Sequence, residues 1–149
     1  MKRLILSFIL LYTVVLEAKV TINSASYQQV VKKGKKRWVK ATKVVPGTII
    51  LYINTISNSN SSSASNLIID NKIPKEMRYI RHSAKSKLRA NITYSVDNSK
   101  SYHKPNRLYV RKHGKKVRAK ASDYTNIRWV IKRLKAKTKT VVQYRAKLK

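Results

Sequence analysis

The chain has 149 residues and no cysteine, which excludes disulfide bonds, thiolate metal sites and a cysteine nucleophile. It carries 35 lysines and arginines against 5 aspartates and glutamates, and the formal net charge of +30 predicts attraction to polyanions. The length corresponds to one domain, large enough to bury about two thirds of its unfolded surface.

The N-terminus matches an export signal. Lys2 and Arg3 precede an apolar run over residues 4–16, which is too short to span a bilayer comfortably, and Ala18 suits a cleavage site. We therefore expect residues 1–18 to be a signal peptide that forms a helix, with an uncleaved N-terminal anchor as the alternative. The rest of the chain is then exported, to the periplasm, the cell surface or the exterior.

Residues 19–26 are expected to be a short linker, and residues 27–149 a single domain. Alternation of apolar and polar residues dominates this domain and is typical of half-buried strands. Weak alternation marks candidate strands at 26–32, 37–44, 77–82 and 107–112.

Two apolar runs lie in the first half of the domain: residues 48–56 are apolar at nearly every position, and residues 66–70 contain three apolar side chains. We expect both to be central strands, buried on both faces or buried on one face and covered on the other, because a charge there would cost several kcal/mol to desolvate. The segment between them, ISNSNSSSASN, is almost pure serine and asparagine. It predicts a solvated connection, with a sugar-binding loop as the alternative, since both residue types suit turns and hydroxyl recognition.

Alternation is clearest in the second half, at 89–97, 126–132 and 138–149. Ile127, Trp129 and Ile131 should face the core, as should one row of the last strand, which is Val142, Tyr144, Ala146 and Leu148. Turn signals such as Pro46-Gly47 and His113-Gly114 separate the runs. The pattern predicts an all-β fold of about seven to nine strands, arranged as a sandwich of antiparallel sheets.

Four stretches together resemble a bacterial secreted repeat family, the conserved repeat domain called domain of unknown function 11. They are VVPGTIILYINTISN, NLIIDNKIPKEMRYI, ITYSVDNSKSY and ASDYTNIRW, and the resemblance covers roughly residues 38–149. The positions that match in order are Pro46, Gly47, Tyr52, Asn58, Asp70, Pro74 and Tyr79, followed by Tyr94–Asp97 and Asp123–Trp129.

The resemblance implies an immunoglobulin-like β-sandwich on an exported or cell-surface protein, and it implies no activity. Two features depart from the family pattern. The stretch Leu134–Lys139 replaces a Pro-Gly before the last strand, and the chain is strongly basic where many members are acidic.

The carboxylates offer little for acid–base chemistry. Asp70, Asp97 and Asp123 are expected to cap turns and Glu76 to be exposed, and among so many cations all should stay ionised, which makes them poor general acids. His82, His103 and His113 lack metal-ligand spacing. We predict a protein with no catalytic site, no cofactor and no metal.

Two tryptophans need separate interpretations. Trp129 lies on the apolar face of its predicted strand and is assigned to the core. Trp38 lies among cations in KKGKKRWVK, where it could stack on a base or sugar, although core burial is favoured.

Basic residues concentrate in two stretches, and these supply the candidate contacts to a polyanion. The candidates are Lys32, Lys33, Lys35, Lys36, Arg37, Trp38, Lys40, Arg111, Lys112, Lys115, Lys116 and Arg118. We expect an interaction or structural module of the envelope whose partners are anionic surface polymers, lipid head groups or other envelope proteins. The alternatives are binding of nucleic acid, including extracellular DNA, and a compositional bias without a specific role.

Overall fold

The computed structural model describes residues 19–149, so the expected signal helix over residues 1–18 lies outside the described residues. Eleven strands and two short 3₁₀ turns make up the described part. The strands are β1 (Val20–Lys32), β2 (Lys35–Lys40), β3 (Ile49–Asn58), β4 (Ala64–Lys72), β5 (Met77–Tyr79), β6 (Lys85–Ser86), β7 (Ala90–Ser95), β8 (Tyr109–Lys112), β9 (Lys115–Arg118), β10 (Asn126–Leu134) and β11 (Lys139–Leu148). The 3₁₀ turns are η1 (Pro105–Arg107) and η2 (Ala121–Asp123).

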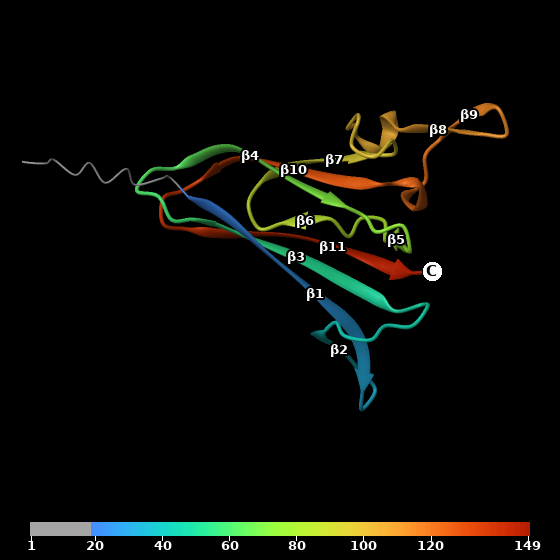
Figure 1. Ribbon diagram of the computed structural model, residues 1–149, viewed down its shortest axis with the longest axis horizontal. Coiled ribbons are helices and arrows are strands. Elements are labelled where there is room, and N and C mark those ends of the chain that lie inside the picture. The colour runs from blue at the N-terminus through green and yellow to red at the C-terminus, as the bar shows by residue number, and fades with distance from the viewer. Residues whose placement is uncertain (1–18) are drawn as a thin grey trace, which may run out of the picture.

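Two antiparallel sheets and a separate hairpin form the molecule (Figure 1). The larger sheet has the order β2-β1-β3-β11-β5, with β6 also paired to β11, and the smaller sheet has the order β4-β10-β7. Strands β8 and β9 pair only with each other among the described residues. The fold is all-β with antiparallel sheets, as the alternating sequence predicted, and it is consistent with a β-sandwich.

The core lies between the two sheets and is built by the predicted alternation. Ile127, Trp129 and Ile131 of β10 are at most 1% exposed, and they meet an equally buried row on β11 that includes Val142 and Tyr144. Each such side chain stabilises the fold by roughly 1.5–3 kcal/mol through burial of its apolar surface. Trp129 is a core residue, as expected.

Tyrosines fill one end of this core. The rings of Tyr79, Tyr94 and Tyr124 lie within 5.8 Å of one another, centroid to centroid, and the hydroxyls of Tyr79 and Tyr94 are 3.1 Å apart. Burial, followed by the hydrogen bond from Tyr79, raises the pKa of Tyr94 well above its ordinary value. The Tyr94 phenol therefore keeps its proton well above neutral pH.

Residues 20–26, expected to be part of a linker, instead form the first half of β1. Val20–Gln28 pair with β3, and Tyr27–Lys32 pair with β2. The strand was not predicted because the serines and asparagine of this stretch give it little strand propensity. Pairing with β3, which is distant in the sequence, supplies the stability that local propensity lacks.

Only one of the two strongly apolar runs is a central strand. Strand β3 lies between β1 and β11, as expected, whereas β4 is an edge strand of the smaller sheet. On β4 the side chain of Ile69 is buried, but that of Ile68 is 59% exposed on the outer face. Strand β4 is therefore covered on one face only.

A buried asparagine anchors the Ser/Asn-rich connection between β3 and β4. Asn58 is 2% exposed, and its side-chain amide donates to the backbone carbonyls of Ser62, Leu134 and Lys135 at 2.9, 3.2 and 3.1 Å. This contact ties the β3–β4 turn to the turn between β10 and β11. The connection is shorter than the expected residues 56–66, because β3 continues to Asn58 and β4 begins at Ala64. Residues 59–63 between the strands are exposed or partly exposed, in agreement with a solvated turn.

Candidate polyanion-binding hairpins

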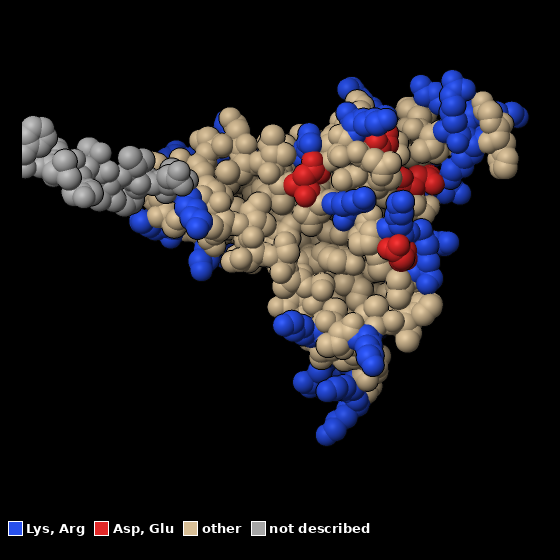
Figure 2. All heavy atoms as spheres, in the orientation of Figure 1, with Lys and Arg blue, Asp and Glu red and all other residues tan. Residues whose placement is uncertain are grey.

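The candidate basic residues fall on two separate hairpins that extend from the sandwich. We call the β1–β2 end, residues 30–40, the first arm and the β8–β9 hairpin, residues 109–118, the second arm. In Figure 1 the first arm lies at the bottom of the molecule and the second at the upper right. Lysine and arginine side chains gather on both arms (Figure 2). The structure therefore divides the candidates into two groups and does not bring them together.

The same turn closes both arms. The first arm turns through Lys33 and Gly34, at φ values of 50° and 72°, and the second through His113 and Gly114, at 50° and 76°. Positive φ at both central positions is the requirement of a type I′ turn, which favours glycine in the second position. The sequence around each turn is Lys-x-Gly-Lys-Lys, so one local motif occurs twice.

Each turn places like charges directly opposite each other. Lys32 pairs with Lys35 in the first arm, and Lys112 pairs with Lys115 in the second. Opposed like charges destabilise a hairpin by roughly 0.2–1 kcal/mol. Both hairpins thus carry the same arrangement of charges, and it lowers their stability. Residues that lower stability in this way are typical of functional sites.

The two faces of the first arm differ in chemistry. Because side chains alternate along a strand, one face carries Lys32, Lys35 and Arg37, which together with Lys33 line an open hollow of about 540 Å³. The opposite face is mixed, with Val31, Lys36, Trp38 and Lys40. Cations are thus available on both sides of the arm.

Trp38 is exposed, which corrects the expectation of core burial. Its side chain is 38% exposed, and it lies opposite Gln29 in the first arm, which extends away from the smaller sheet (Figure 1). Burial in a sandwich requires a second sheet over the strand, and β2 extends beyond that sheet. Trp38 therefore remains available for contacts with a partner.

The second arm also combines cations with an aromatic ring. Tyr109 is 42% exposed and shares a face with Arg111, Lys116 and Arg118. The Nζ atom of Lys116 lies 4.8 Å from the centroid of the Tyr109 ring, within cation–π range.

One candidate of the second arm already has an internal partner. The Nζ atom of Lys112 lies 2.8 Å from Oδ1 of Asp123. Partial burial acts to raise the pKa of Asp123, but hydrogen bonds from Lys112 and the Lys120 N–H outweigh it and hold that pKa below its ordinary value. Lys112 is thus a positioning contact between the arm and the body, and its charge is less available than those of the other candidates.

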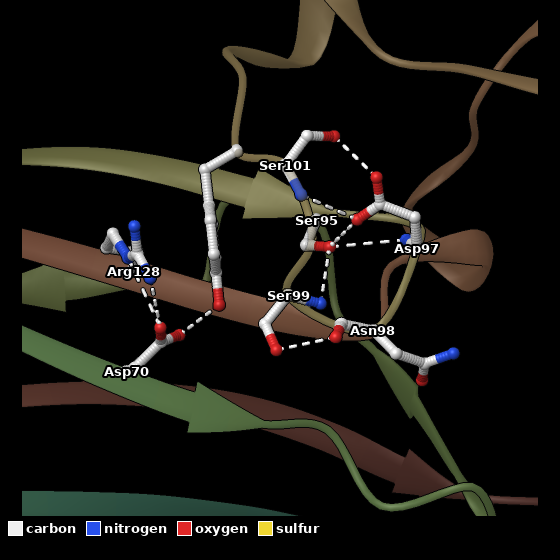
Figure 3. A network of polar contacts seen from close by, with 8 residues as sticks. Asp70, Ser95, Asp97, Asn98, Ser99, Ser101 and Arg128 are labelled. Carbon is white, nitrogen blue, oxygen red and sulfur yellow. Dashed lines mark hydrogen bonds and ion pairs between the residues drawn. The ribbon is translucent and has the colours of Figure 1, made fainter.

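Two other carboxylates, Asp70 and Asp97, also have hydrogen-bond partners within the fold. Asp70 lies directly across from Arg128 in the sheet and accepts two hydrogen bonds from its guanidinium, at 2.6 and 3.2 Å (Figure 3). The Tyr102 hydroxyl donates to the same carboxylate, and the guanidinium of Arg128 stacks on the Tyr102 ring at 3.7 Å. Asp70 was expected to cap a turn, but the sheet register gives it a cross-strand partner instead.

Asp97 caps its turn, as expected. It accepts hydrogen bonds from the side chain and backbone N–H of Ser101, at 2.5 and 3.0 Å, and from the side chain of Ser95 at 2.6 Å (Figure 3). These bonds, those from Ser101 first, lower the pKa of Asp97 to about 2. Glu76 is exposed. Within residues 19–149 no three histidine, aspartate or glutamate side chains are grouped as metal ligands.

A third basic feature lies on the smaller sheet and was missed at the sequence level. An open groove of about 920 Å³ is lined by Arg89, Lys132 and Arg133 together with serine, asparagine and apolar side chains. None of its lining residues is a carboxylate or a histidine. Lys132 and Arg133 are neighbours on β10, and the pairing of β10 with β7 brings Arg89, which directly precedes β7, close to them.

Comparison with known proteins gives no relative for this chain. No family model matches it, and neither the curated proteins nor the solved structures contain a match. The resemblance to the conserved repeat domain therefore stays a prediction. Within the described residues, no helix has the length and apolar character needed to cross a membrane.

Proposed function

We propose that this protein is a non-catalytic module of the cell envelope or cell surface that docks on anionic material through its two basic arms. The observation that carries the proposal is the pair of arms with the same Lys-x-Gly-Lys-Lys turn, in which every cation except Lys112 lacks a carboxylate partner among residues 19–149. Export of the protein is part of the proposal and rests on the N-terminal pattern alone. The immunoglobulin-like character of the sandwich is likewise proposed on the family resemblance.

The charge imbalance supports docking over an internal role for these residues. Leaving out Lys2, Arg3 and Glu17, the chain has 33 basic and 4 acidic residues. The ion pairs among residues 19–149 are Lys112–Asp123 and Arg128–Asp70, so internal pairing accounts for few of the cations. Each lysine or arginine held near an anionic surface contributes about 1 kcal/mol, and six on the first arm alone give reversible attachment.

A salt titration tests the proposal. The full-length protein is mixed with an isolated cell-envelope fraction, and the bound amount is measured as ionic strength rises. We expect retention at low salt, release at high salt, and weaker retention for a variant in which Lys32, Lys35 and Arg37 are glutamine. A matched triple variant at Lys85, Lys87 and Lys139, which lie outside both arms, is the control. Equal losses for the two variants would show that net charge, and not the arms, is responsible, and absence of retention would reject docking.

Binding of nucleic acid is the second candidate function. Exposed Trp38 and Tyr109 lie among cations, which is the combination that single-stranded nucleic acids recognise through stacking and charge. This candidate predicts tighter binding to single-stranded DNA than to an equally charged polymer without bases, and Trp38→Ala should remove the difference. Equal affinity for both polymers would reject it.

A further inference from the structure

Exposed apolar side chains are concentrated on the same arms as the cations. Nine large hydrophobic side chains of the described chain are exposed, and six of them lie on the two arms or in the loop that follows β2. Those six are Val31 (67%), Trp38 (38%), Val44 (37%), Val45 (68%), Tyr109 (42%) and Val117 (37%). A soluble surface usually scatters such residues singly, so their concentration on the basic arms indicates a shared role.

The first arm is amphiphilic along one face. The register places Val31 opposite Lys36 and Gln29 opposite Trp38. Val31 and Trp38 are therefore diagonal neighbours on one face, and Lys36 lies on the same face, next to both of them. Val44 and Val45 follow in the loop between β2 and β3. Exposed apolar side chains and cations thus occur together in this part of the chain.

This combination discriminates between anionic partners. A soluble polyanion gains from the lysines and from stacking on aromatic rings, but four of the six side chains are valines, which have no π face. A lipid bilayer uses both kinds of group, because cations meet the phosphates while apolar and aromatic side chains enter the boundary between head groups and acyl chains. Tryptophan in particular favours this boundary, since it has an apolar body and a polar N–H.

We infer that the first arm and its adjoining loop enter the head-group region of an anionic lipid bilayer, with Val31, Trp38 and Val45 as the inserted side chains. The inference rests on the proposed function and specifies its partner. The second arm supplies further cations and Tyr109 to the same surface.

The two tryptophans make the inference directly measurable. Trp129 is 0% exposed in the core and Trp38 is exposed, and the chain has no other tryptophan. A change in tryptophan emission when lipid is added therefore reports on Trp38. Full-length protein is mixed with vesicles of phosphatidylcholine that contain phosphatidylglycerol, and with vesicles of phosphatidylcholine alone. We expect a blue shift, and quenching by brominated acyl chains, with the anionic vesicles; Trp38→Phe should abolish both.

Matched variants separate insertion from charge. Val31→Ser combined with Val45→Ser should weaken binding to the anionic vesicles by about tenfold, because two apolar side chains then stay in water. Ile68→Ser is the control, since Ile68 is 59% exposed on the outer face of β4, away from the arms. Every variant keeps the same apolar N-terminal run, so its contribution to vesicle binding cancels in the comparison.

The outcomes distinguish failure of this inference from failure of the proposed function. Salt-sensitive binding to vesicles and to DNA without an emission shift or quenching leaves docking intact and overturns insertion. Equal losses for the valine variant and Ile68→Ser also overturn it. Absence of binding to the vesicles, to DNA and to envelope fractions overturns both.

Discussion

We predict that the opposed lysines at the tip of the first arm lower the stability of the arm and strengthen its attraction to an anionic surface. Lys35 lies directly across from Lys32, and neither has a carboxylate partner among residues 19–149. Directly opposed like charges on paired strands destabilise a hairpin by roughly 0.2–1 kcal/mol, and we take the middle of this range, about 0.6 kcal/mol. Replacing Lys35 by glutamine removes this repulsion, so the arm should become more stable while its attraction to an anionic surface falls.

Hydrogen exchange of the β2 backbone amides measures the effect where it arises, because an arm can open without unfolding the core. A gain of about 0.6 kcal/mol slows exchange roughly threefold, since exchange through local opening follows the opening free energy. The effect should vanish near 1 M salt, where the screening length is only about 3 Å.

The second arm supplies the control. Lys115 lies across from Lys112, but the Lys112 ammonium is already paired with Asp123 at 2.8 Å. Lys115→Gln should therefore change β9 exchange less than Lys35→Gln changes that of β2. If Lys35→Gln leaves the exchange of the β2 amides unchanged at low salt, or if the two substitutions have equal effects, then repulsion between Lys32 and Lys35 does not destabilise the first arm.

Three further predictions concern the body of the fold. Asn58→Ala should lower the free energy of unfolding by about 2–3 kcal/mol in urea denaturation, because it removes the donor to the buried Leu134 carbonyl and to two part-buried carbonyls; a loss below 0.5 kcal/mol would contradict the role of Asn58 in tying the two turns together. The pKa of Asp97 is about 2 in the fold against an ordinary value of 3.8, so its contribution to stability is present above about pH 4 and is lost as pH falls toward 2. Asp97→Asn should flatten the dependence of melting temperature on pH in that window, and an unchanged slope would contradict the assignment. Arg128→Lys should cost about 0.5–1 kcal/mol in thermal unfolding, because lysine keeps the charge but loses the two-bond contact with Asp70 and the stacking on Tyr102; a neutral result would assign no stability to this contact.

The sequence predicts the parts of the fold in which alternation reports burial. Strands β10 and β11 alternate cleanly because each has one face in the core, and Trp129 is correctly placed for that reason. Strand β9 was missed because its residues, KKVR, are all exposed and show no apolar face. Strand β6 has only two residues, too few to carry a pattern.

The candidate site was predictable in composition but not in geometry. The two basic stretches are visible in the sequence, and the repeated Lys-x-Gly-Lys-Lys turn was a signal available there for two hairpins. Exposure of Trp38 was not predictable, because a strand's own residues do not tell whether a second sheet covers it. The exposure of Ile68 has the same origin, since edge and central positions depend on partners that are distant in the chain.

The continuity of β1 has a mechanical consequence. This one strand runs from the larger sheet into the first arm, and its residues Val20–Gln28 are held to β3 at nine consecutive positions. Tension applied at the tip along the strand axis is transmitted to all of these positions at once, in shear, instead of peeling them apart one by one. A molecule attached by this arm therefore carries load through a ladder of nine residue pairs, as long as the ladder between β3 and β11, which makes the arm a tether as well as a contact.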